Sequence, residues 1–440
     1  MDSNNSREIN NISSLPNDWE LLELGSILSF ITDGVHNPPK RTTNGIKFIA
    51  GATNIKYLNV DFTNCTYISK EDYDKIHKFY SIEPNDILLT IVGTVGNVAI
   101  VKENDLPFSI QRSIALLRSG PLLYYRFLFY WLNSPEFKKV VYSYVNSTAQ
   151  PGVYLGVIKQ FKMPVPKLSE QKAIAKILSG LDSKIELNQK MNETLESIAQ
   201  AIFKHWFIDF EFPNEEGKPY KSGGGEMVDS ELGKIPKGWK VDKLSKIANV
   251  IDCLHSKKPN FVKSQNFILQ LYNFNEIHSI DLSDPYTVSD GDFHMWTRNI
   301  TVKYGDILVS NAAKVGAISQ VPEWFVGGIG RNITTIRAQG IGEYFLLYYL
   351  TSPLGTNQIS MNTDVGTLFN SLNVKGIRLL RVLIPNSDLM KRSNFIFNSL
   401  RRKIETNLLE NTFLKSTRDL LLPKLMAGKI RISAKVKENE

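Results

Sequence analysis

The sequence predicts an α+β protein made of two pseudo-symmetric globular domains, each followed by a long α-helix, with the two helices paired as an antiparallel coiled coil. Two observations predict this fold. The stretch from Ser169 to Trp206 has no proline and one glycine, and it carries an apolar seam at heptad spacing. The same seam recurs 219 residues later, together with the globular region that precedes it. A period this long indicates duplication of a domain rather than a solenoid.

The composition is that of an ordinary globular protein with a basic balance. The chain has 440 residues, of which 42% are hydrophobic and 22% charged, and its net charge is +8. This charge favours a polyanionic partner. Cys65 and Cys253 lie far apart, so neither a disulfide framework nor a zinc ribbon is expected. With no apolar leader and no long apolar run, we expect a cytoplasmic location.

The repeat defines the expected domain boundaries. The motif LPNDW at 15–19 is similar to IPKGW at 235–239, and NDILL at 85–89 is similar to GDILV at 305–309. We expect a polar tail at 1–14, a first globular domain at 15–166, a first helical region at 167–211, a linker at 212–234, a second globular domain at 235–385, a second helical region at 386–432 and a charged tail at 433–440.

The two helical regions share a seam with asparagines at equivalent positions. Buried asparagines fix the register of a coiled coil, so their recurrence predicts that the helices pair with each other. The alternative is two separate amphipathic helices, each packed on its own domain. We expect Ser169 to cap the first helix, and Ser393 and Arg418 to loosen the pairing at the start and near the end of the second helix. The seam comprises Leu178, Leu181, Ile185, Asn188, Asn192 and Leu195 in the first helix, and Leu400, Ile404, Asn407, Asn411 and Leu414 in the second.

Within each globular domain the pattern predicts short strands and one apolar helix. The strands are expected near 47–50, 86–92 and 97–101, and again near 306–310 and 317–321. The apolar helices are expected at 122–133 and 341–351. The linker contains three consecutive glycines at 223–225, so we expect it to be exposed and loosely ordered.

No motif supports catalysis or metal binding. A P-loop is absent from the sequence, and the NPPK stretch at 37–40 lacks the aromatic residue with which a base-flipping methyltransferase would stack its target. The glycine-rich stretches at 93–96 and 327–330 are expected to be hairpin turns, with close approach to a DNA phosphate as the alternative. The six histidines show no metal-ligand spacing.

The two copies differ mainly in their polar loops. Arginine reads guanine, asparagine and glutamine read adenine, and lysine holds phosphates, so these loops are candidates for DNA binding. His36 and His255 fall within one residue of each other under the repeat. The candidates are His36, Lys40, Arg41, Thr94, Gln111 and Arg112 in the first copy, and His255, Lys257, Lys258, Asn311, Lys314, Arg331 and Asn332 in the second.

Several stretches carry a resemblance to a known family. KIELN at 184–188, NETL at 192–195, AIFK at 201–204 and LLPKLMAGKI at 421–430 are the most specific, supported by DGVHNPPK at 33–40 and IDCLHSKKP at 251–259. Over essentially its whole length the chain resembles the specificity (S) subunits of type I restriction-modification enzymes.

The resemblance implies two target-recognition domains that each read one half of a bipartite double-stranded DNA site, with the coiled coil as a spacer. It implies no catalytic centre and no cofactor on this chain. S-adenosylmethionine would bind to two modification (methyltransferase) subunits, and ATP and Mg²⁺ to restriction (motor and nuclease) subunits. Two other hypotheses are a stand-alone DNA methyltransferase or nuclease with cryptic motifs, and a coiled-coil adaptor that binds only proteins.

Overall fold

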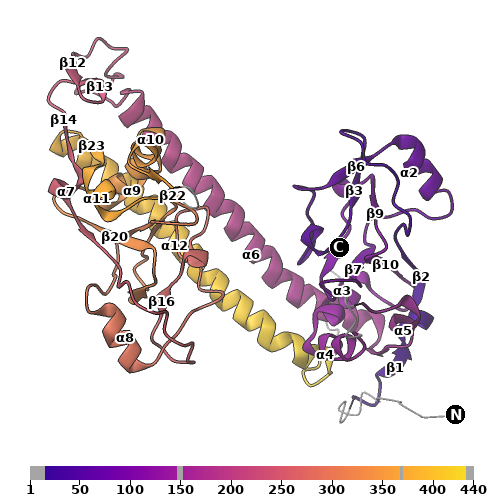
Figure 1. The fold of residues 1–440 in the computed structure, drawn as a ribbon. Helices are drawn as coiled ribbons and strands as arrows, with labels where there is room; N and C mark the ends of the chain where they lie inside the picture. The colour runs from indigo at the N-terminus through magenta and orange to yellow at the C-terminus, as the bar shows by residue number, and fades with distance from the viewer. Residues whose placement is uncertain (1–14, 146–151, 367–369, 433–440) are drawn as a thin grey trace. The chain divides into compact units, whose positions relative to one another are not determined.

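The structure, a computed structural model, describes residues 15–145, 152–366 and 370–432. The chain forms two compact units: unit 1 comprises Met1–Ile185 and Phe413–Glu440, and unit 2 comprises Glu186–Thr412. The division falls within two long helices, α6 (Leu168–Phe203) and α12 (Ser387–Met426) (Figure 1). In the part of the chain that the structure describes, no helix is both long enough and apolar enough to cross a bilayer.

Unit 1 contains a four-stranded antiparallel sheet in the order β2-β10-β7-β8. The same unit contains a three-stranded sheet in the order β6-β3-β9 and a two-stranded sheet in which β1 pairs with β11. The strands are β1 (Glu20–Glu23), β2 (Leu28–Asp33), β3 (Ile46–Ile49), β4 (Ile55–Lys56), β5 (Asn59–Val60), β6 (Thr66–Ile68), β7 (Ile87–Thr90), β8 (Val98–Ile100), β9 (Phe108–Ile110), β10 (Ile114–Ser119) and β11 (Lys162–Val165). The short helices are α1 (Leu24–Ile27), α2 (Lys70–Ile76), α3 (Tyr125–Asn133), α4 (Pro135–Ser143) and α5 (Leu155–Lys159).

Unit 2 repeats this topology with the sheet order β15-β20-β17-β18, and β14 pairs with β23. Its strands are β12 (Met227–Ser230), β13 (Gly233–Pro236), β14 (Lys240–Lys243), β15 (Ala248–Ile251), β16 (Ile268–Leu269), β17 (Ile307–Ser310), β18 (Ile318–Gln320), β19 (Gly328–Ile329), β20 (Ile333–Ala338), β21 (Asp364–Val365), β22 (Asn370–Ser371) and β23 (Arg381–Ile384). Its short helices are α7 (Leu244–Ile247), α8 (Asp290–Thr297), α9 (Glu343–Thr351), α10 (Pro353–Met361) and α11 (Val374–Leu379). The equivalent sheets confirm the internal repeat.

The core of each unit forms around one apolar helix, α3 in unit 1 and α9 in unit 2. Every residue from Phe127 to Leu132 in α3 is buried, as is every residue from Tyr344 to Leu350 in α9. A helix that is apolar all round has to be enclosed on every side. The central strands β7 and β17 are likewise buried along their whole length. The predicted strands and helices are therefore confirmed, with bounds that shift by a few residues.

The two long helices are antiparallel and in contact within each unit. In unit 2, Asn188 Nδ2 donates to Asn411 Oδ1 (2.9 Å) and Asn407 Nδ2 donates to Asn192 Oδ1 (2.8 Å). The predicted pairing is confirmed, and the alternative in which each helix packs only on its own domain is wrong. Among the seam residues, Leu178, Ile185, Asn188, Asn192, Ile404, Asn407 and Asn411 are buried, and Leu181, Leu195, Leu400 and Leu414 are half-buried.

Two expectations about the helices are wrong. Helix α6 begins at Leu168, so Ser169 lies inside its first turn instead of capping it. Arg418 does not loosen the pairing in unit 1, because its Nη1 donates to Asp182 Oδ1 of α6 at 2.9 Å. A charged seam residue is accommodated when the opposite helix supplies its counter-ion.

The segment at 212–234 is more ordered than its glycines suggested. Phe212 is buried and stacks on Trp239, with ring centroids 5.2 Å apart, and the segment forms most of the β12–β13 hairpin. Much of the segment is nevertheless exposed, as expected, including 215–219 and the turn at Gly224, where φ is +87°. The stretch at 93–96 joins β7 to β8, as expected of a hairpin turn, whereas Gly328–Ile329 forms β19, which pairs with β16 in parallel. The hairpin prediction for 327–330 is therefore wrong.

Candidate nucleic-acid interface

One edge of the main sheet in unit 1 gathers the polar loops. Strands β2 and β7 end at this edge and β10 begins there, since Ala115 pairs with Asp33 and Ile114 pairs with Thr90. The Val35 amide donates to the Ile110 carbonyl (3.0 Å), and the Arg112 amide donates to the Val35 carbonyl (3.1 Å). These bonds tie the loop of His36 to that of Arg112. We call this edge, with His36, Thr94, Gln111 and Arg112, the loop edge of unit 1.

Unit 2 has an equivalent edge. Strands β15 and β17 end there and β20 begins there, because Ile251 pairs with Thr335 and Ser310 pairs with Ile333. The Asn311 amide donates to the Asn332 carbonyl at 2.8 Å, which joins the loops on either side. The loop edge of unit 2 carries His255, Asn311, Lys314, Arg331 and Asn332, and all but the half-buried Asn311 are exposed.

The remaining basic candidates are held to different degrees. Lys40 and Lys257 are exposed. The Arg41 guanidinium lies over the Phe48 ring, 3.9 Å from its centroid, and burial lowers the pKa of Arg41. The Lys258 ammonium lies 3.9 Å from the centroid of Tyr286. Arg41 and Lys258 would therefore have to give up a cation–π contact to reach a DNA phosphate. Lys40 and Lys257 are exposed and can turn toward a phosphate without that loss.

Both copies orient their histidine with an aspartate three residues earlier. His36 Nε2 lies 3.0 Å from Asp33 Oδ2, and His255 Nε2 lies 2.9 Å from Asp252 Oδ2. Because a carboxylate only accepts, Nε2 carries the hydrogen and Nδ1 faces away from the carboxylate. About two-thirds of each histidine side chain is exposed. Asp33 and Asp252 were not among the candidates, although the Asp-x-x-His spacing recurs at an offset of 219.

Two exposed aromatic residues also belong with these loops. Tyr154 is 76% exposed and follows Val153, whose amide donates to the Ile91 carbonyl just after β7. Phe261 is 59% exposed and makes an edge contact with Tyr286 in unit 2. Exposed aromatic faces can stack on nucleic-acid bases. They were not among the candidates, because nothing in a loop sequence distinguishes an exposed aromatic side chain from a buried one such as Phe325.

The fold already uses the side chain of Asn311. Its Nδ2 donates to the Leu372 carbonyl (2.7 Å), and its Oδ1 accepts from the Thr334 hydroxyl (3.0 Å). Asn332 adopts a φ of +66°, a left-handed conformation that asparagine tolerates better than most residues. Both residues thus shape the loop edge of unit 2.

Asp252, Cys253 and His255 place one potential ligand atom each within 4.8 Å of one another. The carboxylate and the imidazole are already bonded to each other, and Gly34 occupies the position of Cys253 in the first copy. The thiol faces the backbone of Asn332 and Ile333, and burial raises its pKa. The feature that both copies share is therefore the Asp–His pair.

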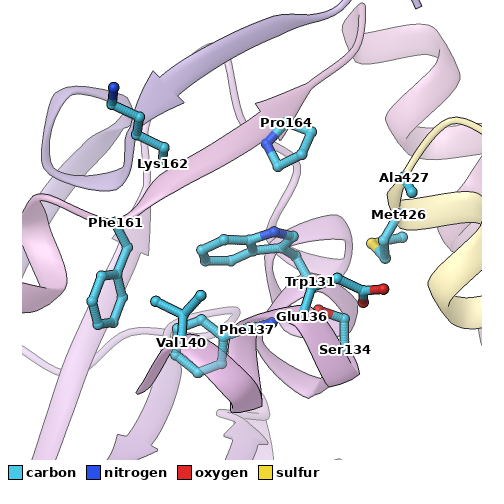
Figure 2. Close-up of a pocket in the computed structure, with 10 residues that line it drawn as sticks. All are labelled: Trp131, Ser134, Glu136, Phe137, Val140, Phe161, Lys162, Pro164, Met426 and Ala427. Carbon is cyan, nitrogen blue, oxygen red and sulfur yellow. Dashed lines mark hydrogen bonds between the residues drawn. The ribbon is translucent and has the colours of Figure 1, made fainter. Parts of the chain in front are cut away.

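Unit 1 has a small apolar cavity next to α4, with a volume of about 40 Å³. Figure 2 shows Trp131 at the centre of its lining. Pockets that hold small molecules usually measure about 300–1,000 Å³, so this cavity is too small for a cofactor of ordinary size. It is lined by Trp131, Ser134, Glu136, Phe137, Val140, Phe161, Lys162, Pro164, Met426 and Ala427.

Comparisons with known proteins show what the chain is similar to. The model of the type I restriction modification DNA specificity domain matches residues 16–197. The putative MjaX specificity subunit of Methanocaldococcus jannaschii is 25% identical over 439 residues, covering 96% of each chain. The MjaIX specificity subunit of the same organism is 26% identical over 359 residues, covering 79% of this chain and 78% of the relative.

A solved structure shares the fold. It is the type I restriction-modification S subunit from M. genitalium, which is 18% identical with a TM-score of 0.52, over 94% of this chain and 98% of that one. With the domain match and the relatives that align along the chain, this likeness agrees with the duplicated sheets and paired helices described above. Residues 16–197 therefore carry a type I restriction modification DNA specificity domain, and along most of its length the chain is similar to specificity subunits of type I restriction-modification enzymes.

Proposed function

We propose that this specificity subunit reads a bipartite double-stranded DNA site, one part with the loop edge of each unit. The observation that carries the proposal is that the same edge of a duplicated sheet presents different polar side chains in the two copies. A shared scaffold with two distinct polar surfaces suits two different target sequences. The target-recognition domains are residues 15–166 and 235–385, and the net charge of +8 favours DNA as the partner.

Side-chain chemistry assigns roles within each loop edge. Arg112 and Arg331 are exposed and can bond the O6 and N7 atoms of guanine, while Gln111 and Asn332 can bond adenine. Lys40, Lys257 and Lys314 are exposed and suited to phosphates. His36 and His255 are presented by their aspartates with Nδ1 outward as an acceptor, which suits an amino group on a base edge.

As a specificity subunit the chain is non-catalytic, and the catalytic activities of type I systems lie in other subunits. We propose that it binds two modification subunits, because the internal repeat offers two equivalent surfaces. Restriction subunits would complete the assembly. S-adenosylmethionine would bind to the modification subunits and ATP with Mg²⁺ to the restriction subunits, with no cofactor on this chain.

The test is to express the chain with its modification subunit and to map the methylated DNA motif by sequencing. Replacing residues 15–166 with the equivalent domain of a relative should change one half of the motif and leave the other half intact. A change in both halves would refute the assignment of one half-site to each unit.

The same preparations separate the two alternative functions. Methylation by the purified chain alone would indicate a stand-alone methyltransferase. Association with partner subunits without any DNA binding would indicate a protein adaptor. Binding that weakens steeply with salt would support neutralisation of phosphates by the exposed lysines.

A further inference from the structure

Each unit contains one ion pair between α6 and α12, which is buried in unit 2 and mostly buried in unit 1, where the Arg418 side chain is 15% exposed. In unit 1, Arg418 Nη1 donates to Asp182 Oδ1 (2.9 Å), and the hydroxyls of Tyr57 (3.0 Å) and Tyr130 (2.7 Å) donate to Asp182 Oδ2. In unit 2, Arg401 Nη1 and the Tyr348 hydroxyl each donate to Glu196 Oε2 at 3.2 Å. Asp182, Glu196 and Arg401 are buried.

The two pairs run in the same direction: both acids lie on α6 and both arginines on α12. This breaks the internal repeat. At an offset of 219, Asp182 corresponds to Arg401, Glu196 corresponds to Lys415, and Arg418 corresponds to Ala199. At one buried position the two helices therefore carry opposite charges, Asp182 in α6 and Arg401 in α12.

The buried asparagines, in contrast, obey the repeat. Asn188 corresponds to Asn407, and Asn192 corresponds to Asn411. Each contact joins Asn188 or its equivalent Asn407 to Asn192 or its equivalent Asn411. Two copies of the same helix, placed antiparallel, could therefore form the same two contacts. The asparagines thus fix the register but do not select the partner.

We infer that the buried charges commit α6 and α12 to each other and exclude pairing of like helices between two copies of this chain. If two α6 helices paired in the asparagine register, Glu196 of one copy would face Asp182 of the other. If two α12 helices paired, Arg418 of one copy would face Arg401 of the other. In both cases buried charges lose their counter-ions and meet like charges.

The cost of separating these charges from their counter-ions is large enough to decide whether α6 pairs with α12 or with a second α6. Removing one partner of a buried ion pair typically changes an equilibrium by more than about a hundredfold, and a like pairing disrupts two such pairs at once. The inference concerns how the chain assembles and is independent of DNA reading, so its failure would leave the proposed function untouched.

The test starts from the complete folded chain with a protease site inserted between Gly223 and Gly224, which are exposed. After cleavage the two halves are unfolded in urea, refolded together and weighed as complexes by native mass spectrometry. Random assortment would make about half of the dimers homotypic, meaning two copies of the same half. We expect homotypic dimers to stay below about one part in fifty, as the estimated preference requires. Homotypic dimers near the random proportion, or separate monomeric halves, would overturn the inference.

A charge exchange tests the cause. Asp182→Arg with Arg418→Asp keeps opposite charges facing each other within the chain, and it also gives like helices opposite charges at facing positions. We expect the homotypic fraction to rise at least tenfold, consistent with the loss of a buried like-charge contact. The control is Glu186→Lys with Lys190→Glu, which reverses a surface ion pair on α6 and should leave the fraction unchanged.

If the exchanged chain does not refold, Asp182→Asn with Arg418→Gln removes both charges, with an isosteric side chain at 182 and a shorter one at 418. This neutral variant should raise the homotypic fraction less than the charge exchange does. The like-charge repulsion is relieved, but Glu196 or Arg401 still has no counter-ion in a homotypic dimer. A fraction equal to that of the unmodified chain in whichever variant refolds would refute the role of the charges.

Discussion

Replacing Arg401 with methionine should reduce the free energy of unfolding of unit 2 by about 3–5 kcal/mol. The guanidinium is fully buried and donates to Glu196 (3.2 Å) and to the carbonyls of Ile277 (2.8 Å) and His278 (3.1 Å). Methionine fills a similar space, so the loss comes from the charge and the hydrogen bonds. Glu196 keeps bonds from Tyr348 (3.2 Å) and Gln200 (3.0 Å), which places the expected loss near the lower value.

Unfolding in urea, followed by hydrogen exchange of peptides from unit 2, would measure this loss. With a slope of about 1–3 kcal/mol per molar, the midpoint should fall by at least about 1 M. Lys403→Met, at an exposed position two residues away, is the control and should change stability by less than about 0.5 kcal/mol. Adding Glu196→Gln to Arg401→Met removes the unpaired carboxylate and should recover part of the loss. A loss below about 1 kcal/mol for Arg401→Met would refute this account of the pair.

Three further perturbations test other features. Asn188→Leu alone removes the donor to Asn411 and should cost about 1–3 kcal/mol in thermal unfolding, whereas adding Asn411→Leu should restore or exceed the original stability. Burial raises the pKa of Glu405, so the folded chain holds this proton more tightly than the unfolded chain and loses stability as the pH rises past the usual glutamate value. Glu405→Gln should therefore be the more stable form at pH 7 and lose that advantage below about pH 4, as urea titrations at both pH values would show. Arg112→Ala should weaken DNA binding about 5- to 150-fold and relax only one half-site, and Arg331→Ala only the other, which fluorescence anisotropy with variant duplexes would reveal.

The periodic parts of the fold could be predicted from the sequence. The seam from Leu178 to Leu195 and the strand around Leu88 follow from apolar spacing alone, and the repeat then assigns their counterparts. Charged seam positions could not be interpreted in this way. Arg418 looks like a defect in a heptad, because its counter-ion Asp182 is 236 residues away in the sequence.

For the candidate site, the sequence predicted the loops but not the contacts of their side chains. The repeat and the strand pattern indicate which loops correspond, but not that Asn311 is bonded to the carbonyl of Leu372, 61 residues later. The order of the 212–234 segment was equally hidden, because it depends on the packing of Phe212 against Trp239 rather than on the glycines. By contrast, the pairing of Asp33 with His36 could have been inferred, since its spacing recurs in the second copy.

The symmetry of the asparagine contacts has an evolutionary consequence. A single-copy ancestor that dimerised through this helix could have formed the same contacts between Asn188 and Asn192 of two molecules, because the repeat maps them onto the present pairs. Gene duplication and fusion would then have inherited a working register without any substitution at these positions. Once the copies were joined, the two helices could change independently, and the loops of each half could acquire their own targets while the register stayed the same.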